Sequence, residues 1–304
     1  MKGFLHNTWK HRAHFIMCIP VLLVLLFFSY IPMAGMSMAF KRFDFSKGIW
    51  GSPFVGLDNF QFLLASGKTF TRMTVNTLKY YAIFLILGTS LNIAVAIAID
   101  QFVFKRLGKT FQSIMIIPVF ISYAAVQFIV YAFLGNNGMV NNVLQFMGLE
   151  PIRWYINAKY WTTILTVVKM WNGVGYGSVL FMSVLAGIDQ EMYEAARIDG
   201  ANKRQQIFHI TLPSLIPMTT IVILLSVGGI MRSDTGLFYQ VTRNSGILYS
   251  TTQVIDSYIL NALMTTSAYG FSAAAALYQS VVGLVLILIA NYVVRKIEPD
   301  NALF

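Results

Sequence analysis

Two short stretches end in the Gly-Lys-Thr triplet that closes a phosphate-binding loop, so nucleotide binding is the first chemistry to consider. The triplets occupy residues 67–69 and 108–110. The phosphate-binding pattern also needs a glycine five residues before the glycine of the triplet. Phe62 and Val103 stand at those two positions. The sequence therefore predicts that both triplets are ordinary loop residues and that any ATP is hydrolysed by another chain.

Histidines are the next candidates, because their ring nitrogens bind metals and move protons near neutral pH. His6, His11 and His14 fall in the N-terminal arm, and His209 lies in a polar passage far along the chain. No cysteine or acid nearby completes a metal site. The one cysteine, Cys18, lies inside an apolar run and leaves no intrachain disulfide. We expect no catalytic residues, no metal and no cofactor in this chain.

Polar side chains inside long apolar runs carry more information. Six of them recur at helical spacing in two runs: Tyr123, Gln127, Tyr131, Lys169, Asn172 and Tyr176. Residues three or four apart lie on the same face of a helix. Aromatic rings and amides are the groups that bind the faces and hydroxyls of sugars, so these residues are candidates for a substrate path. Hydrogen bonds that hold one membrane helix to another are the alternative, and they are at least as good an account of each tyrosine and amide taken singly.

Lys169 is the most specific of the six, because a cation well inside an apolar segment needs a partner or water. A carboxylated sugar, a carbonyl group or an acid on another chain would each serve. Arg232 and Asp234 lie at the end of a later apolar run. They could gate the outer mouth of the path, but we expect them to form a plain surface ion pair.

The elements that must position these residues are six long apolar runs. The chain of 304 residues is 57% hydrophobic and 11% charged, whereas charged residues make up about a quarter of soluble domains. The runs cover residues 15–40, 74–99, 111–134, 161–187, 212–232 and 272–294, each near the ~20 residues that cross a bilayer. The sequence predicts an all-α membrane protein with six transmembrane helices. The basic residues behind the net charge of +10 are dispersed between these runs, which argues against nucleic acid as a partner.

A polar passage at 188–211 separates the fourth and fifth runs. Gln190 to Ile198 has good helix formers, with Asp189 as a plausible N-cap. Gly200 stands where a helix end needs a residue able to take positive φ. Asn202 and Gln205 have the spacing of a capping box, and Pro213 either ends the second piece or opens the next helix. We predict a helix, a glycine corner and a second short helix.

The spacing in this passage resembles the EAA loop of permease subunits in ATP-binding-cassette importers. The matching residues are Glu194, Ala195, Ala196, Gly200, Ile210, Leu212 and Pro213. The resemblance implies a type I importer permease fold, with the loop in the cytoplasm and docked on the ATPase subunit. Segments 30–40, 43–60, 185–201 and 278–297 extend the resemblance to the LplB-type branch of carbohydrate permeases. That branch is associated with the uptake of oligosaccharides and complex glycans.

The resemblance also implies partners. Members usually work with a second homologous permease, an ATPase dimer that binds ATP and Mg²⁺, and an extracellular lipoprotein receptor for the solute. We expect a multi-pass protein of the bacterial plasma membrane with both termini in the cytoplasm. Residues 1–14 would be a cytoplasmic arm, 15–294 the permease domain and 295–304 a cytoplasmic tail. Lysines and arginines at the inner helix ends favour this orientation by a small excess.

Two rival functions remain open at this point. An ion-coupled secondary transporter of a polar solute would show paired acids inside its spans or broken helices in matching halves. The runs contain hardly any acid, and no internal repeat is visible. A membrane receptor or assembly factor would carry a sizeable soluble domain at one end, and the two terminal arms are short.

Overall fold

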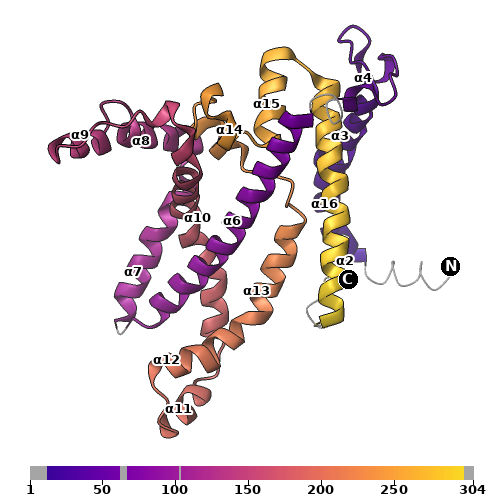
Figure 1. Cartoon of the computed structure of the whole chain (residues 1–304). Coiled ribbons are helices and arrows are strands. Elements are labelled where there is room, and N and C mark those ends of the chain that lie inside the picture. Colours follow the sequence, from indigo (N-terminus) through magenta and orange to yellow (C-terminus); the bar gives the residue numbers. More distant parts are fainter. Residues whose placement is uncertain (1–11, 62–66, 103, 298–304) are drawn as a thin grey trace. The chain divides into compact units, whose positions relative to one another are not determined.

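The computed structural model of the protein describes residues 12–61, 67–102 and 104–297, and these residues fold almost entirely into helices (Figure 1). Within them the pairing of β type is one isolated bridge between Lys41 and Phe54. The all-α expectation is confirmed. The described residues divide into two compact units, one within 12–61 and 262–278 and the other within 67–261 and 279–297.

Among the described residues, four helices are long and apolar enough to cross a membrane, and six if each of two bent pairs counts as one span. The four are Ile16–Phe40, Gly67–Asp100, Lys203–Val227 and Tyr269–Lys296. The bent pairs are Arg106–Phe120 with Tyr123–Phe146 and Ala158–Ala186 with Gln190–Ile198. These segments coincide with the six predicted runs.

The third run, 111–134, is not the continuous helix that its apolar composition predicts. α7 (Lys105–Ile116) tightens into the 3₁₀ turn η4 (Ile117–Phe120), and α8 (Tyr123–Leu134) then leaves at an angle of 102°. Pro118 has no N–H to continue the α pattern. Ser122 takes an extended backbone conformation, and its Oγ accepts from the N–H of Ala125, which starts α8 afresh. The sequence prediction of a span here did not include this break, which a proline and an N-cap serine inside the apolar run produce.

The first unit begins with one long apolar helix. Its successive parts are α2 (Arg12–Leu25), the π turn η1 (Leu26–Tyr30), α3 (Ile31–Met33) and the 3₁₀ turn η2 (Ala34–Phe40). The N–H of Ile31 bonds to the carbonyl of Leu26, five residues back, directly before Pro32. This wide turn carries the helix past a proline that would otherwise clash with the preceding turn.

A loop packs against the end of this helix, with the short elements α4 (Gly48–Gly51) and η3 (Asp58–Phe60). The Asn59 side chain donates to the carbonyls of Met38, Ala39 and Lys41 at 3.3, 2.9 and 2.9 Å. One amide therefore bonds three carbonyls at the end of the helix, where carbonyls lack the N–H partners of a continuing helix.

The second unit is built on two long helices, α6 (Gly67–Asp100) and α10 (Trp161–Ala186). Its other elements are α9 (Met139–Phe146), η5 (Trp154–Ile156), η6 (Ala158–Tyr160), α11 (Gln190–Ile198), α12 (Lys203–Gln206), η7 (Ile207–Thr211), α13 (Leu212–Val227), η8 (Leu237–Val241), η9 (Gly246–Leu248) and α14 (Tyr249–Thr252). α15 (Ile255–Thr266) and α16 (Tyr269–Ile297) contribute residues to both units. In Figure 1, α11 and α12 lie at one end of α10, and α8, α9 and α14 lie at the other.

Two buried clusters hold the second unit together. The larger includes Tyr80, Val126, Trp161, Leu165 and Phe238, so it joins α6, α8, α10 and η8. The smaller, which we call the lower cluster, is Ala96, Phe181, Leu185 and Leu215, from α6, α10 and α13. Each end of α10 is therefore packed against its neighbours.

Candidate functional site

α11 forms where the sequence predicts it, from Gln190 to Ile198. The Asp189 carboxylate accepts from the N–H of Glu191 at 3.0 Å and so caps the first turn. Glu191 adds a negative charge to the same turn, and Arg197 adds a positive charge to the last turn. Both signs suit the helix dipole, so the helix is stabilised by its own residues.

The corner after α11 depends on Gly200, which has φ of +81°. The N–H of Ala201 bonds to the carbonyl of Ala196 at 2.8 Å, and the N–H of Gly200 bonds to that of Arg197 at 3.1 Å. This pair of bonds is the Schellman motif, which needs a left-handed residue at the glycine position. An added Cβ at Gly200 would meet nothing within 4 Å, so backbone conformation alone makes glycine the suitable residue.

The chain then restarts with the predicted capping box. The Asn202 side chain accepts from the Gln205 N–H at 3.0 Å, and the Gln205 side chain accepts from the Asn202 N–H at 2.8 Å. The helix that begins here runs without a corner from Lys203 to Val227. Pro213 lies in the first turn of α13, and η7 precedes it as a π turn in which the N–H of Leu212 bonds to Ile207. Pro213 therefore lies at the start of α13, as expected, but α13 continues directly from α12 and η7. The π turn lets the helix continue past the proline, which has no N–H to donate.

The polar passage presents an uncovered surface. Glu194 and Ala195 are exposed, and Ala196 is half-buried. Two large apolar side chains, Met192 and Ile198, are 50% and 87% exposed. No ion-pair partner of the Glu194 carboxylate lies within the described chain. The surface combines small, apolar and acidic groups on one short helix.

The rest of the passage lies at the base of α13. Ile210 and Leu212 are half-buried, and Pro213 is exposed. The Tyr193 hydroxyl on α11 is 3.0 Å from the hydroxyl of Thr211, which is buried. Gln206, also buried, donates to the carbonyl of Ala201 at 3.1 Å. The Tyr193–Thr211 contact ties α11 to the helix that enters the lower cluster.

A cavity of about 310 Å³ with both polar and apolar lining residues lies further along the same unit, between α6, α10, the end of α13 and η8. The Lys169 ammonium is 2.8 Å from an oxygen of the Asp234 carboxylate, and the two side chains are 31% and 27% exposed. Both residues line the cavity, as do Tyr81 and Ser226, whose hydroxyls are 3.0 Å apart. The partner of Lys169 is thus an acid of its own chain.

This pairing corrects the expected Arg232–Asp234 ion pair. Arg232 lines the cavity but is exposed, and Asp234 binds Lys169 instead. Water solvates the charge of an exposed arginine, so it needs no ion-pair partner. A cation on the inner side of α10 needs a counter-charge. Sequence proximity favoured the wrong partner.

Asn172 is buried and bonded on both sides. Its Nδ2 donates to the Pro118 carbonyl at 2.7 Å, and its Oδ1 accepts from the Tyr123 hydroxyl at 3.3 Å. The same hydroxyl is within hydrogen-bonding reach of Asp234. Asn172 therefore holds the carbonyl that the break after α7 sets free, which is the helix-packing role among the two alternatives.

The other candidates for the substrate path differ in their contacts and in their exposure. Tyr123 and Tyr131 do share a face of α8, with Gly236 close beside Tyr123 and Arg243 stacked on Tyr131 at 4.5 Å. Gln127 is half-buried on the same helix. Tyr176 is 60% exposed. The six candidates, three on α8 and three on α10, therefore do not form one continuous strip.

Residues 88–299 match the family described as "Binding-protein-dependent transport system inner membrane component". The chain belongs to this family. The permease is similar to protein LplB of Bacillus subtilis (strain 168), with 30% identity over 291 residues that cover 94% of this chain and 90% of the relative. It is also similar to the polygalacturonan/rhamnogalacturonan transport system permease protein YteP of the same organism, with 26% identity over 301 residues, 99% of this chain and 93% of the relative.

Solved structures agree with this assignment. One chain of a bacterial ABC transporter involved in the import of the acidic polysaccharide alginate matches with a TM-score of 0.86 and 28% identity, over 97% of this chain and 99% of that chain. A second match, from the alginate transporter in complex with an alginate pentasaccharide-bound periplasmic protein, has a TM-score of 0.85 and 28% identity, over 96% and 97%. The protein is therefore a multi-pass membrane permease subunit of an ATP-binding-cassette importer, with the type I importer fold.

Proposed function

We propose that this permease subunit takes up an oligosaccharide or complex glycan, and that a separate ATPase dimer drives it. The similar permease YteP and the similar alginate importer both carry saccharide polymers in their names. A second homologous permease would complete the path, the ATPases would bind ATP and Mg²⁺, and an extracellular lipoprotein receptor would deliver the solute. The periplasmic protein in the similar alginate complex supports the receptor.

The observation that carries this proposal is that α11 is stabilised by its own caps and exposes large apolar side chains. A docking helix has to keep its shape without its partner, and the caps at Asp189 and Gly200 provide this. Ile198, at 87% exposure, would bury its side chain in a groove of the ATPase. Glu194 would make a polar contact at the edge, while Ala195 and Ala196 would allow close approach.

Coupling would then follow from the connections of α11. ATP binding would close the two ATPases and pull α11, and the Tyr193–Thr211 contact would pass that pull to α13. The lower cluster links α13 to α6 and α10, so these helices would turn as near-rigid bodies. The passage 188–211, both termini and the arms 1–14 and 295–304 would then face the cytoplasm.

Gly200→Val tests this role. Valine is branched at Cβ and is strongly disfavoured at φ of +81°, so the corner should open and α11 should lose its position. We expect the variant to insert normally, because the corner lies outside the apolar spans. It should lose co-purification of the ATPase, receptor-stimulated ATP hydrolysis and glycan uptake.

Gly148→Val is the matched control. Gly148 has φ of +75°, open space around its Cβ position and the same pair of backbone bonds at the end of α9, far from α11. This variant carries the same backbone strain but should retain the ATPase. Normal uptake and normal ATPase co-purification by Gly200→Val would contradict the docking role of α11.

A further inference from the structure

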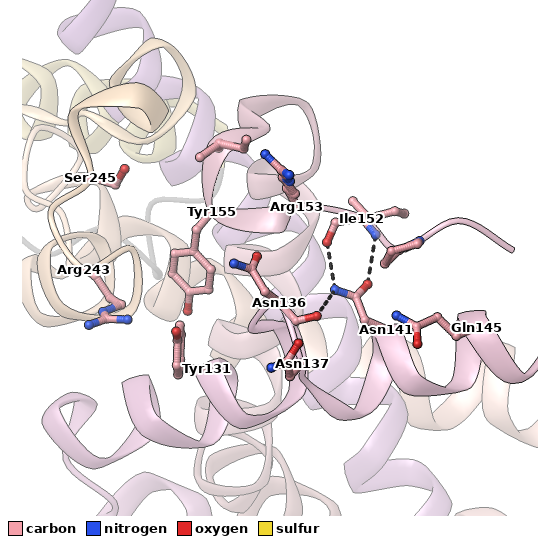
Figure 2. Close-up of a pocket in the computed structure, with 12 residues that line it drawn as sticks. Tyr131, Asn136, Asn137, Asn141, Gln145, Ile152, Arg153, Tyr155, Arg243 and Ser245 are labelled. Atoms are coloured by element: carbon pink, nitrogen blue, oxygen red, sulfur yellow. Dashed lines mark hydrogen bonds between the residues drawn. The ribbon is translucent and has the colours of Figure 1, made fainter.

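A second polar pocket lies at the end of α10 opposite to α11. It has a volume of about 650 Å³, which is within the range of small-molecule sites. Its walls come from the end of α8, from α9, from the segment 151–156 and from the turn after η8 (Figure 2). α10 has 26 residues, so about 40 Å of helix separates this pocket from the coupling end. The proposed orientation places it on the outer side of the membrane.

The charge of this pocket is positive and unbalanced. Arg153 and Arg243 line it, and its other lining residues are neutral. Within the described chain, neither guanidinium has a carboxylate at ion-pair distance. The amides of Asn136, Asn137 and Gln145 add hydrogen-bonding groups around the two cations. Arginine binds planar carboxylates through two parallel hydrogen bonds, so a carboxylate fits this lining.

Arg243 is held in a backbone conformation that favours glycine. Its φ is +55°, and the next residue, Asn244, has φ of +48°. The N–H groups of Arg243 and Asn244 bond back to Gln240 and Tyr239 at 2.8 and 2.9 Å, which fixes the turn. Non-glycine residues at positive φ store strain, and such residues gather at binding sites. The turn carries an arginine where glycine would cost less, and the guanidinium lies over the Tyr131 ring.

The opposite wall is fixed by Asn141, which is 1% exposed. Its Nδ2 donates to the carbonyls of Gly135, Asn136 and Ile152, and its Oδ1 accepts from the Ile152 N–H at 3.0 Å. Figure 2 shows these bonds between α9 and the segment that carries Arg153. The pocket is thus formed before any ligand arrives, which lowers the entropic cost of binding.

Two aromatic rings lie between the arginines. Tyr155 packs edge-on against Tyr131, with ring centroids 5.5 Å apart. Burial raises the pKa of the Tyr155 phenol to about 12, although the nearby Arg243 opposes this shift. The phenol stays protonated near neutral pH and donates to the Val241 carbonyl at 3.4 Å, which fixes the ring. Tyr131 is 43% exposed, which leaves part of its ring open to a sugar.

We propose that this pocket binds a carboxylate-bearing saccharide, with Arg153 and Arg243 at the carboxylates and the surrounding amides and tyrosines at the sugar rings. This inference rests on the proposed function and names the class of glycan. Asp234 already neutralises Lys169, so we expect the pocket with Arg153 and Arg243, and not Lys169, to select acidic sugars.

Binding of trigalacturonate to the purified permease–ATPase complex in lipid nanodiscs, without receptor, tests the proposal. The fully methyl-esterified trisaccharide is the matched ligand, since it keeps the sugar rings and lacks the charges. We expect the acid to bind at least about tenfold more tightly than the ester, and the Arg153→Gln/Arg243→Gln double variant to lose that difference. Lys159→Gln, which removes an exposed cation near the same end of α10 but outside the pocket lining, should bind like the wild type.

Arg243→Gly is the second variant, because glycine accepts the positive φ without strain. If the arginine serves a ligand, this variant should keep a thermal unfolding midpoint close to that of the wild type and still bind trigalacturonate several-fold more weakly. A purely structural arginine would give lower stability with unchanged binding, and this result would overturn the proposal.

Three other outcomes would also overturn it. One is the absence of saturable trigalacturonate binding by the wild-type complex, and another is equal binding of the ester. The third is unchanged sugar binding by the double variant with weaker stimulation of ATP hydrolysis by the receptor, which would make the arginines a receptor contact. The proposed function is judged separately, by ATP-dependent uptake and by the Gly200→Val variant, so either idea can fail alone.

Discussion

At the scale of single residues, the Lys169–Asp234 contact governs part of the charge of the cavity of about 310 Å³. The half-buried ammonium and carboxylate are 2.8 Å apart and neutralise each other, so the charge that remains in the lining is that of Arg232. Removing one member of such a pair leaves the other partly buried and without a counter-charge, which costs more than the pair itself contributes. The pair therefore matters most through the penalty for breaking it.

We expect Lys169→Met to lower thermal stability and uptake, because it leaves Asp234 unpaired at the cavity wall. Asp234→Asn alone should also destabilise the protein, and the double variant should recover most of the loss. A double-mutant cycle on the unfolding of the detergent-solubilised complex should give a coupling of about 1–3 kcal/mol. Additive single effects would show that the two side chains do not depend on each other.

At the scale of elements, α10 owes its position to two glycines. An added Cβ on Gly175 would lie 1.8 Å from the Met115 carbonyl oxygen of α7, and one on Gly177 would lie 2.4 Å from the Asn92 amide of α6. Small residues let helix backbones approach in this way inside a membrane, where packing replaces the hydrophobic driving force. By contrast, a Cβ on Gly173 of the same helix would meet nothing within 4 Å.

Gly175→Ala and Gly173→Ala form a matched pair on this helix. The first should force α7 and α10 apart and destabilise the protein by about 1–3 kcal/mol or more, as overpacking does. The second should be neutral or stabilising by up to about 1 kcal/mol, because alanine is the better helix former. Thermal unfolding of the two purified variants separates these expectations, and equal effects would contradict the close contact with α7.

The elements also show which features a sequence can predict. The caps of α11, the Gly200 corner and the Asn202–Gln205 box depend on residues within a few positions of one another, so spacing was enough to predict them. The break between α7 and α8 was missed because the length of an apolar run indicates that it can cross a membrane, but not whether the helix bends within it. Pro118 and Ser122 were the available signal.

Contacts between distant segments were not predictable in the same way. Lys169 and Asp234 are 65 residues apart, and Tyr193 meets Thr211 only after the chain has turned at Gly200. The pocket with Arg153 and Arg243 joins segments that are further apart still in the sequence, and no spacing along the chain links them. Periodicity places a residue on a face, whereas its partner depends on the fold.

At the scale of the whole molecule, the second unit contains both proposed functional sites. α11 and its uncovered apolar face lie at one end of α10, and the arginine-lined pocket lies at the other. Because α10 is buried against α6 along its length, a movement imposed at α11 cannot leave the pocket end unaffected. This arrangement suits a protein that links events on the two sides of a membrane.

The two ends must then face opposite compartments, and cysteine labelling measures this directly. In a Cys18→Ala background, Phe146→Cys and Ile198→Cys each place one thiol at a side chain that is 94% or 87% exposed. We expect a membrane-impermeant maleimide to label Phe146→Cys in intact cells, and Ile198→Cys only after permeabilisation. Co-expression of the ATPase should protect the thiol at 198 and leave that at 146 reactive, because docking would bury α11. Labelling of Ile198→Cys from outside intact cells would reverse the orientation and remove the basis of the coupling mechanism.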